Sequence, residues 1–98
     1  MEFLIIAHDG TDEGAAERRQ KVREEHLAHA RRMKKLGHIV EGGALLDPEG
    51  NMIGSTLYAR FETLEDLNRY LGNDPYTTSG VWLRTEIYPI KLADLVGT

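Results

Sequence analysis

The chain has 98 residues, of which 41% are hydrophobic and 29% charged, a balance that excludes a disordered chain and gives enough length for one small domain with one core. The net charge of −4 argues against a general nucleic-acid binder, and the absence of cysteine excludes disulfides, a thiolate nucleophile and cysteine-ligated zinc. No apolar run reaches the ~20 residues of a membrane span and the start lacks the basic region of a signal peptide, so we expect a single domain over residues 1–98, in the cytoplasm and away from membranes.

Hydrophobic periodicity divides the chain into four strands and two main helices. In chain order we predict a strand at residues 3–7, a helix at 15–36, strands at 38–46 and 52–61, a helix at 64–72, one helical turn at 75–80 and a strand at 81–90. The order β-α-β-β-α-β predicts an α+β protein of the ferredoxin-like class, in which two helices cover one face of an antiparallel sheet.

Residues with marked backbone preferences shape the first half of the chain. Residues 3–7 form an unbroken apolar run, which is typical of a strand buried on both faces. Thr11 and Asp12 offer N-cap oxygens to the long helix, and Gly37 follows that helix as a C′ residue. The glycine pair at 42–43 predicts a close backbone approach or a bulge in the second strand.

Turn and capping signals also punctuate the second half. Residues 47–50, Asp-Pro-Glu-Gly, have the pattern of a type I turn that closes a hairpin. Thr63 should cap the second helix. The buried stripe predicted for that helix consists of Leu64, Leu67 and Leu71. Asp74 followed by Pro75 predicts a capped single helical turn.

Two helices on one face leave the other face of the sheet uncovered. The first strand is apolar on both faces, and strict alternation along residues 81–90 places Trp82 and Tyr88 on the uncovered face. A second copy of the chain is the simplest cover, because two-fold homodimers are the commonest oligomers. We therefore expect a homodimer in which the open sheet faces meet.

The long helix carries a histidine among its apolar side chains. At 3.6 residues per turn, one stripe contains Val22, His26, Ala30, Met33 and Leu36. An imidazole in that stripe is either a satisfied core residue or a titrating group that lines a cavity. Eight of the 12 basic residues lie between positions 18 and 35, which indicates either a solvated helix face or attraction of an anionic substrate.

Asp74 is the candidate partner of His26. Its carboxylate is explained by capping alone, but an ionised aspartate beside His26 would also hold the imidazole in one tautomer, as the acid of a catalytic triad does. Ser55 could donate a hydrogen bond to a developing oxyanion, or could simply fit its strand. The His26–Asp74 pair therefore has a structural and a catalytic interpretation, and the two are compatible.

The sequence gives little support for a metal or a cofactor. His26 and His29, three residues apart, could clasp a metal with His8 or Asp9, but no glutamate completes a zincin-type motif. The glycines form neither a phosphate loop nor a dinucleotide fingerprint. We expect no metal and no cofactor.

These residues, taken in order, also match a family pattern. The matching segments are Arg19-x-x-x-Arg23-x-x-His26-Leu27, Gly42-Gly43, Gly50, Gly54-Ser55 and Asp74-Pro75-Tyr76-x-x-Ser79-Gly80-Val81-Trp82, ending at Pro89. The chain resembles the YciI-like (YCII-related) family nearly from end to end. The resemblance implies a ferredoxin-like α+β fold that dimerises into an α/β barrel.

The resemblance also implies an activity and its residues. Family members share a histidine and an aspartate proposed as an active-site pair, which fall on His26 and Asp74, and Ser55 matches the family's serine near the same pocket. The activity attached to the family is cofactor-free dehydrochlorination of a chlorinated hydroxyquinol-type aromatic. The chain departs from the family pattern at Ala44, where proline is usual, and at Ser79, where alanine is commoner, and both positions border the pocket.

The leading hypothesis is a cofactor-free enzyme that acts on a small, aromatic or phenolic substrate by elimination or isomerisation. His26 would transfer the proton, Asp74 would orient it and Ser55 would stabilise negative charge on oxygen. The substrate-binding candidates are Arg19, Arg23 and Tyr76. The alternatives are a non-catalytic dimeric module that binds a small ligand or serves as an accessory subunit, and a purely structural domain.

Overall fold

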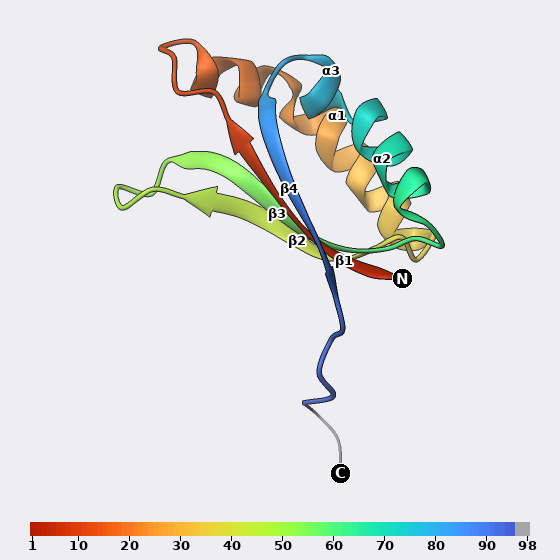
Figure 1. Cartoon of the computed structure of the whole chain (residues 1–98). Coiled ribbons are helices and arrows are strands. Elements are labelled where there is room, and N and C mark those ends of the chain that lie inside the picture. The colour runs from red at the N-terminus through yellow and green to blue at the C-terminus, as the bar shows by residue number, and fades with distance from the viewer. Residues whose placement is uncertain (96–98) are drawn as a thin grey trace.

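The computed structural model describes residues 1–95 and consists of one four-stranded sheet with three helices on one side (Figure 1). The elements are β1 (Glu2–Asp9), α1 (Ala15–Lys35), β2 (Ile39–Leu46), β3 (Met52–Arg60), α2 (Leu64–Asn73), α3 (Pro75–Thr78) and β4 (Trp82–Ile90). The strand order is β2-β3-β1-β4, and all neighbours are antiparallel. The predicted ferredoxin-like α+β class is confirmed. Within residues 1–95, no helix has the length and apolar character needed to span a bilayer.

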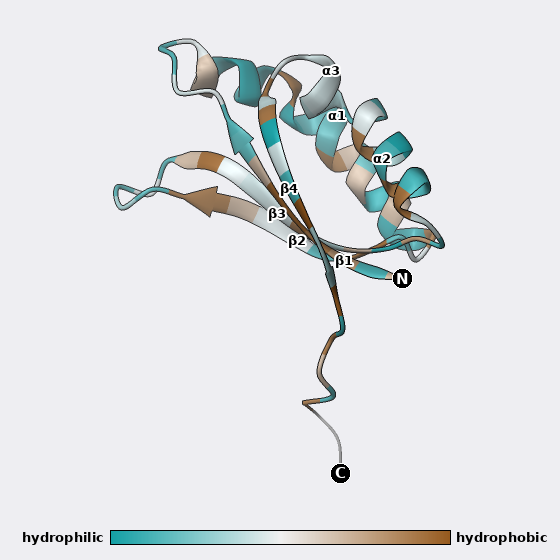
Figure 2. Cartoon of the chain, in the orientation of Figure 1, coloured by the Kyte–Doolittle hydropathy of each residue, from teal (hydrophilic) through white to brown (hydrophobic). Residues whose placement is uncertain are grey.

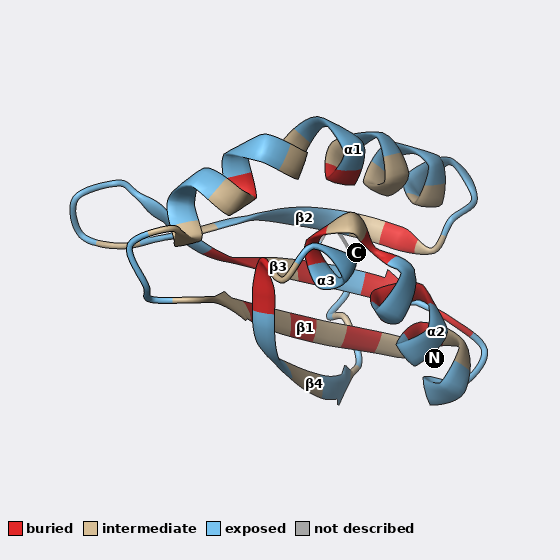
Figure 3. Ribbon diagram, turned by 90° about the horizontal axis from the view of Figure 1, so that it is seen from above, coloured by how far each residue is buried: buried red, intermediate tan, exposed pale blue. Residues whose placement is uncertain are grey.

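The core lies between the sheet and the helices, and β1 runs along its floor. Phe3, Ile5 and Ala7 point toward the helices and are at most 1% exposed. Leu4 and Ile6 point to the other face and are half-buried, so β1 alternates along its length in Figure 3. The prediction that this strand is buried on both faces is wrong for the single chain, because nothing in residues 1–95 covers the second face.

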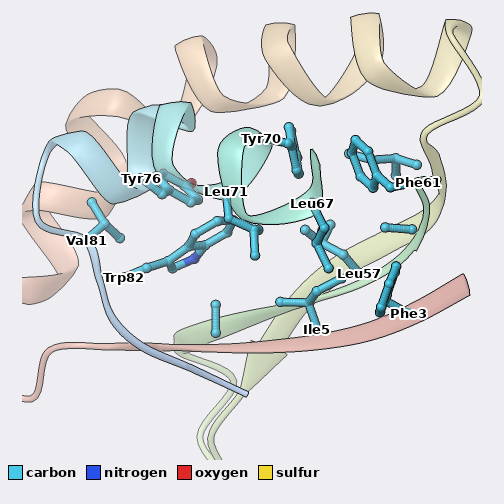
Figure 4. Packing of buried hydrophobic residues seen from close by; sticks show 13 residues of the cluster. Phe3, Ile5, Leu57, Phe61, Leu67, Tyr70, Leu71, Tyr76, Val81 and Trp82 are labelled. Carbon is cyan, nitrogen blue, oxygen red and sulfur yellow. The ribbon is translucent and has the colours of Figure 1, made fainter. Parts of the chain in front are cut away.

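The second helix packs through a stripe that differs from the predicted one. Thr63 caps α2 as predicted, since its Oγ1 accepts from the backbone N–H of Asp66 at 3.1 Å. The residues that α2 buries are Leu67, Tyr70 and Leu71. In Figure 4, Leu67 and Leu71 point toward the sheet and Tyr70 lies beside Phe61. The inclusion of Leu64 is wrong: it is the first residue of the helix and is 48% exposed.

The side-chain cap predicted for the start of α1 is also wrong. The N-cap is Gly14, which makes no side-chain cap, and the Asp12 carboxylate instead binds both terminal nitrogens of Arg18 at 2.7 Å. This hydrogen-bonded pairing with Arg18 lowers the pKa of Asp12 to about 2. The other end agrees with the prediction to within one residue, because α1 stops at Lys35 and Gly37 has a positive φ of 84°.

A bulge at the start of β4 decides which face Trp82 occupies. His8 pairs with Arg84, but the next residue, Asp9, pairs with Trp82, so Leu83 is an extra residue between two pairs. Asp9 lies on the helix-facing side, and Trp82 opposite it is therefore buried, while Leu83 is 65% exposed. The prediction that Trp82 lies on the open face is wrong, because strict alternation does not anticipate an inserted residue.

The glycine pair of β2 shows the close approach that was predicted, but no bulge. A Cβ at Gly42 would lie 2.6 Å from a methyl of Leu57, whereas a Cβ at Gly43 would meet nothing within 4 Å. The irregularities of the β2–β3 pairing fall elsewhere, the first of them between Ile39 and Glu41. The hairpin turn is confirmed, since the N–H of Gly50 donates to the carbonyl of Asp47 at 3.0 Å.

We expect Gly54→Ala to destabilise the protein by about 1–3 kcal/mol, as overpacking in a tight interior does. A Cβ at Gly54 would overlap the backbone carbonyl oxygen of Ala7, so β3 and β1 would have to separate. Gly43→Ala is the matched control, because its added methyl enters open space, and its effect should stay within about 0.5 kcal/mol. Urea unfolding of the two variants checks this; equal midpoints would contradict the close approach.

Candidate active site

A cavity of about 380 Å³ lies between α1 and the β2–β3 hairpin. Of the predicted site residues, those that line it are Arg19, Arg23, His26, Ser55 and Tyr76. The remaining one, Asp74, is fully buried beside His26. α1 is largely hydrophilic in Figure 2, and the residues that it buries fully are the polar Arg19 and His26. At these two positions, α1 therefore makes buried polar contacts where a helix normally buries apolar side chains.

His26 and Asp74 are joined by a hydrogen bond, although 48 residues separate them. Nδ1 of His26 lies 2.8 Å from Oδ1 of Asp74, whose side chain is 0% exposed. The same oxygen accepts from the backbone N–H of Tyr76 at 2.9 Å, so Asp74 caps α3 as well. An ionised carboxylate only accepts, so Nδ1 donates to it, and in the neutral imidazole Nε2 then has the free lone pair. Among residues 1–95, no group hydrogen-bonds to Nε2, and His26 lines the cavity.

Two aromatic rings fix the plane of the His26 imidazole. The ring of Tyr76 stacks on it with centroids 3.9 Å apart and planes at 9°, and Trp82 meets it edge-on at 5.3 Å. Figure 4 shows Tyr76 and Trp82 together at one end of the core. Burial raises the pKa of Tyr76 above its ordinary value, while the positive charges of Arg19 and Arg23 act in the opposite direction. The Tyr76 hydroxyl is therefore a neutral donor at physiological pH.

Ser55 is held by two donors from different parts of the chain. Its Oγ accepts from Nη2 of Arg19 at 2.9 Å and from Nε1 of Trp82 at 3.1 Å. Arg19 is itself fixed, because its Nη1 binds both oxygens of Asp9 at 2.9 Å and its guanidinium lies 4.7 Å above the ring of Tyr76. A hydroxyl has two lone pairs and one proton. With both lone pairs engaged, Ser55 keeps its O–H to donate, and Ser55 lines the cavity.

His29 is a residue of the network that the sequence prediction did not include. Its Nδ1 lies 3.4 Å from Oδ2 of Asp74, so two histidines one turn apart approach opposite oxygens of one buried carboxylate. The hydroxyl of Tyr70 is also buried nearby and has no hydrogen-bond partner within residues 1–95. Burial and the charge of Asp74 raise the pKa of Tyr70. The spacing of the two histidines was the available signal.

Asp9 is the second residue that the prediction missed. It was considered only as a metal ligand, yet its side chain is 4% exposed and neutralises Arg19. The signal was its position, because Asp9 continues the buried face of β1 that begins at Phe3 and Ile5. His8, the other ligand considered, points to the open face and pairs with Glu86 at 2.6 Å. Residues 1–95 contain no cluster of three or more histidine, aspartate or glutamate side chains that could hold a metal ion.

Comparison with known proteins places relatives along almost the whole chain. Residues 1–91 match the model of the YCII-related domain. The chain is 31% identical over 97 residues to the protein YciI of Escherichia coli and to that of Shigella flexneri. Each alignment covers 93% of this chain and 97% of the relative.

Solved structures resemble this one at two levels. The 5-chloro-2-hydroxyhydroquinone dehydrochlorinase of Burkholderia phenoliruptrix, solved in complex with 2,5-dihydroxybenzoquinone, gives a TM-score of 0.81 at 28% identity, covering 95% of this chain and 96% of that one. Rv0793 of Mycobacterium tuberculosis gives a TM-score of 0.55 at 14% identity, covering 96% and 100%. The second likeness concerns the fold alone.

Proposed function

The chain belongs to the family of YCII-related domains, and from that premise we propose that it is a cofactor-independent enzyme acting on a small, phenolic or aromatic substrate. The reaction would be an elimination or isomerisation that begins with proton transfer to His26. The dehydrochlorinase with a similar structure supports this class of chemistry. A fold hosts many functions, so the site rather than the fold has to carry the argument.

The observation that carries the proposal is the environment of the His26 imidazole. Nδ1 of His26 is hydrogen-bonded to the fully buried Asp74 carboxylate at 2.8 Å, and the ring of Tyr76 stacks on the imidazole with centroids 3.9 Å apart. His26 also lines the cavity, and its Nε2 has no hydrogen-bond partner within residues 1–95. A general base needs this combination of orientation, a free lone pair and access to substrate. A histidine that served packing alone would not need to line a cavity.

The remaining residues have distinct roles in the proposed reaction. Nε2 of His26 removes a proton from a substrate hydroxyl, and Ser55 and the neutral Tyr76 donate hydrogen bonds to the oxygen on which negative charge develops. Arg19 positions Ser55 and fixes Tyr76, and Arg23 contributes positive charge beside the Tyr76 hydroxyl. For a chlorinated hydroquinone, His26 returns the proton to the ring carbon that bears chlorine, which gives the ketone tautomer. A second hydroxyl then loses its proton as the carbon–chlorine bond breaks and chloride leaves, with net loss of HCl.

Chloride release from 5-chloro-2-hydroxyhydroquinone tests the proposal directly. We expect the wild-type chain to accelerate this release without added metal or cofactor. The brominated analogue tests whether the enzyme also releases bromide, and the non-halogenated compound is the control without a leaving group. Binding of these compounds without turnover would contradict an enzyme and support the alternative, a small-ligand-binding module.

We also propose that two copies associate through the open face of the sheet. Tyr58 and Tyr88 are 41% and 47% exposed there, beside the half-buried Leu4 and Ile6. Exposed apolar faces of this kind favour association. Sedimentation should give twice the 11.1 kDa mass of the chain. Tyr58→Glu should shift the species to the monomer, whereas a monomeric wild type at micromolar concentration would contradict the interface.

A further inference from the structure

We propose that the preferred substrate of this cavity carries a carboxylate in addition to the hydroxyl that reacts at His26, and that Arg31 binds this carboxylate. The inference rests on the proposed function in that it concerns the same cavity. It goes beyond that function by naming a substrate class, the hydroxyaryl or keto carboxylic acids, and a specificity residue that neither the sequence pattern nor the relatives' names indicate.

Two of the basic residues that line the cavity are not neutralised by a carboxylate. The basic residues that line it are Arg19, Arg23, Arg31 and Lys34. Arg19 is neutralised by Asp9 at 2.9 Å, and Lys34 lies 3.4 Å from Glu41 and also donates to the carbonyl of Val40. Arg23 and Arg31 both lack an acidic partner within residues 1–95. Glu41 is the one carboxylate residue among those that line the cavity, and it is the partner of Lys34.

Arg23 differs from Arg31 in its position. Arg23 is half-buried and lies about one turn before His26, and its positive charge acts to lower the pKa of Tyr76. Arg31 is exposed and lies two turns further along α1. Arg23 therefore acts beside the reacting groups, whereas the exposed Arg31 is free to meet an incoming anion.

The cavity wall between His26 and Arg31 is apolar. The two residues are five positions apart on α1, about 7.5 Å along the helix axis and about 140° around it, so the cavity lies between their side chains. The wall between these positions carries Leu27 and Ala30, and the sheet opposite contributes Leu57. This segment fits an apolar ring or short chain, with a polar oxygen at one end and an anion at the other.

A pair of isosteric probes tests the inference by binding alone. 4-Hydroxyphenylacetate and 4-hydroxyphenylacetamide differ in charge but hardly in shape, and isothermal titration calorimetry on the full chain gives both affinities. We expect the acid to bind about tenfold more tightly than the amide, since a hydrogen bond to a charged group is stronger than one to a neutral group. Arg31→Gln should weaken the acid by about that factor and leave the amide unchanged.

Arg32→Gln is the matched control, because Arg32 is the next residue on α1, is exposed and does not line the cavity. It should leave the affinities of both probes unchanged. Equal affinity of acid and amide, equal losses in the two arginine variants, or no binding of the acid in the millimolar range would each overturn the inference. The preference for the acid over the amide should persist in His26→Asn, which should lose turnover. Failure of the carboxylate inference and failure of the proposed catalysis are therefore distinguishable.

Discussion

Replacing His26 with asparagine should lower turnover by about a hundredfold to ten-thousandfold, the range that one general base contributes. Asparagine can still donate to Asp74 from a similar position, but it has no lone pair of useful basicity to offer the substrate. The cavity would therefore still bind ligand and no longer activate it. Initial rates of chloride release under saturating substrate measure the loss, and thermal unfolding shows whether the fold is kept.

His29→Asn provides the control for that variant. Both histidines approach the same carboxylate of Asp74, at 2.8 and 3.4 Å, but His29 does not line the cavity between α1 and the β2–β3 hairpin. We expect His29→Asn to reduce turnover by less than about tenfold, in keeping with a positioning residue. Equal losses in the two variants would show that the carboxylate network, and not the His26 nitrogen, limits the reaction.

Asp74→Ala should destabilise the protein by about 3–5 kcal/mol, the effect of removing one partner from a buried polar cluster. The variant would leave Nδ1 of His26 and the backbone N–H of Tyr76 without an acceptor in a region that water does not reach. It would also remove the N-cap of α3. Urea unfolding followed by circular dichroism measures the change.

Asp74→Asn separates stability from catalysis. The amide oxygen still accepts hydrogen bonds, so the stability loss should be smaller, about 1–2 kcal/mol. The amide can also donate, so the preference for the Nδ1–H tautomer of His26 is lost and turnover should fall, as it does when the acid of a triad is replaced. Nitrogen-15 chemical shifts of the imidazole report the tautomer directly. Full turnover with a mixed tautomer would reduce Asp74 to a helix cap.

The order of elements was predictable because each one carries its own local signal. The Asp-Pro-Glu-Gly sequence at 47–50 determines a turn, and Pro75 after Asp74 determines a capped turn, whatever surrounds them. The stripe of α1 likewise identified His26 as facing inward, where it is 6% exposed. Leu36, which the same stripe included, is 65% exposed, because α1 ends at Lys35 and Leu36 is its C-cap.

The remaining parts of the site depend on contacts that a periodic pattern does not contain. The burial of Trp82 results from one extra residue in β4, and strict alternation assigned it to the opposite face. The role of Asp9 depends on Arg19 reaching across from α1, and that of His29 depends on which oxygen of Asp74 is free. These are tertiary pairings between groups 10 to 45 residues apart.

The bulge in β4 has a spectroscopic consequence. Trp82 is the one tryptophan of the chain, and its burial places the indole 5.3 Å from the imidazole of His26 and in hydrogen-bond contact with Ser55. Excited at wavelengths that tyrosine does not absorb, the protein therefore emits from a single fluorophore beside the imidazole and the hydroxyl of the candidate site. Protonation of the imidazole, or entry of a quinone-like ligand, should change this emission. The protein thus carries an intrinsic optical reporter of its own cavity.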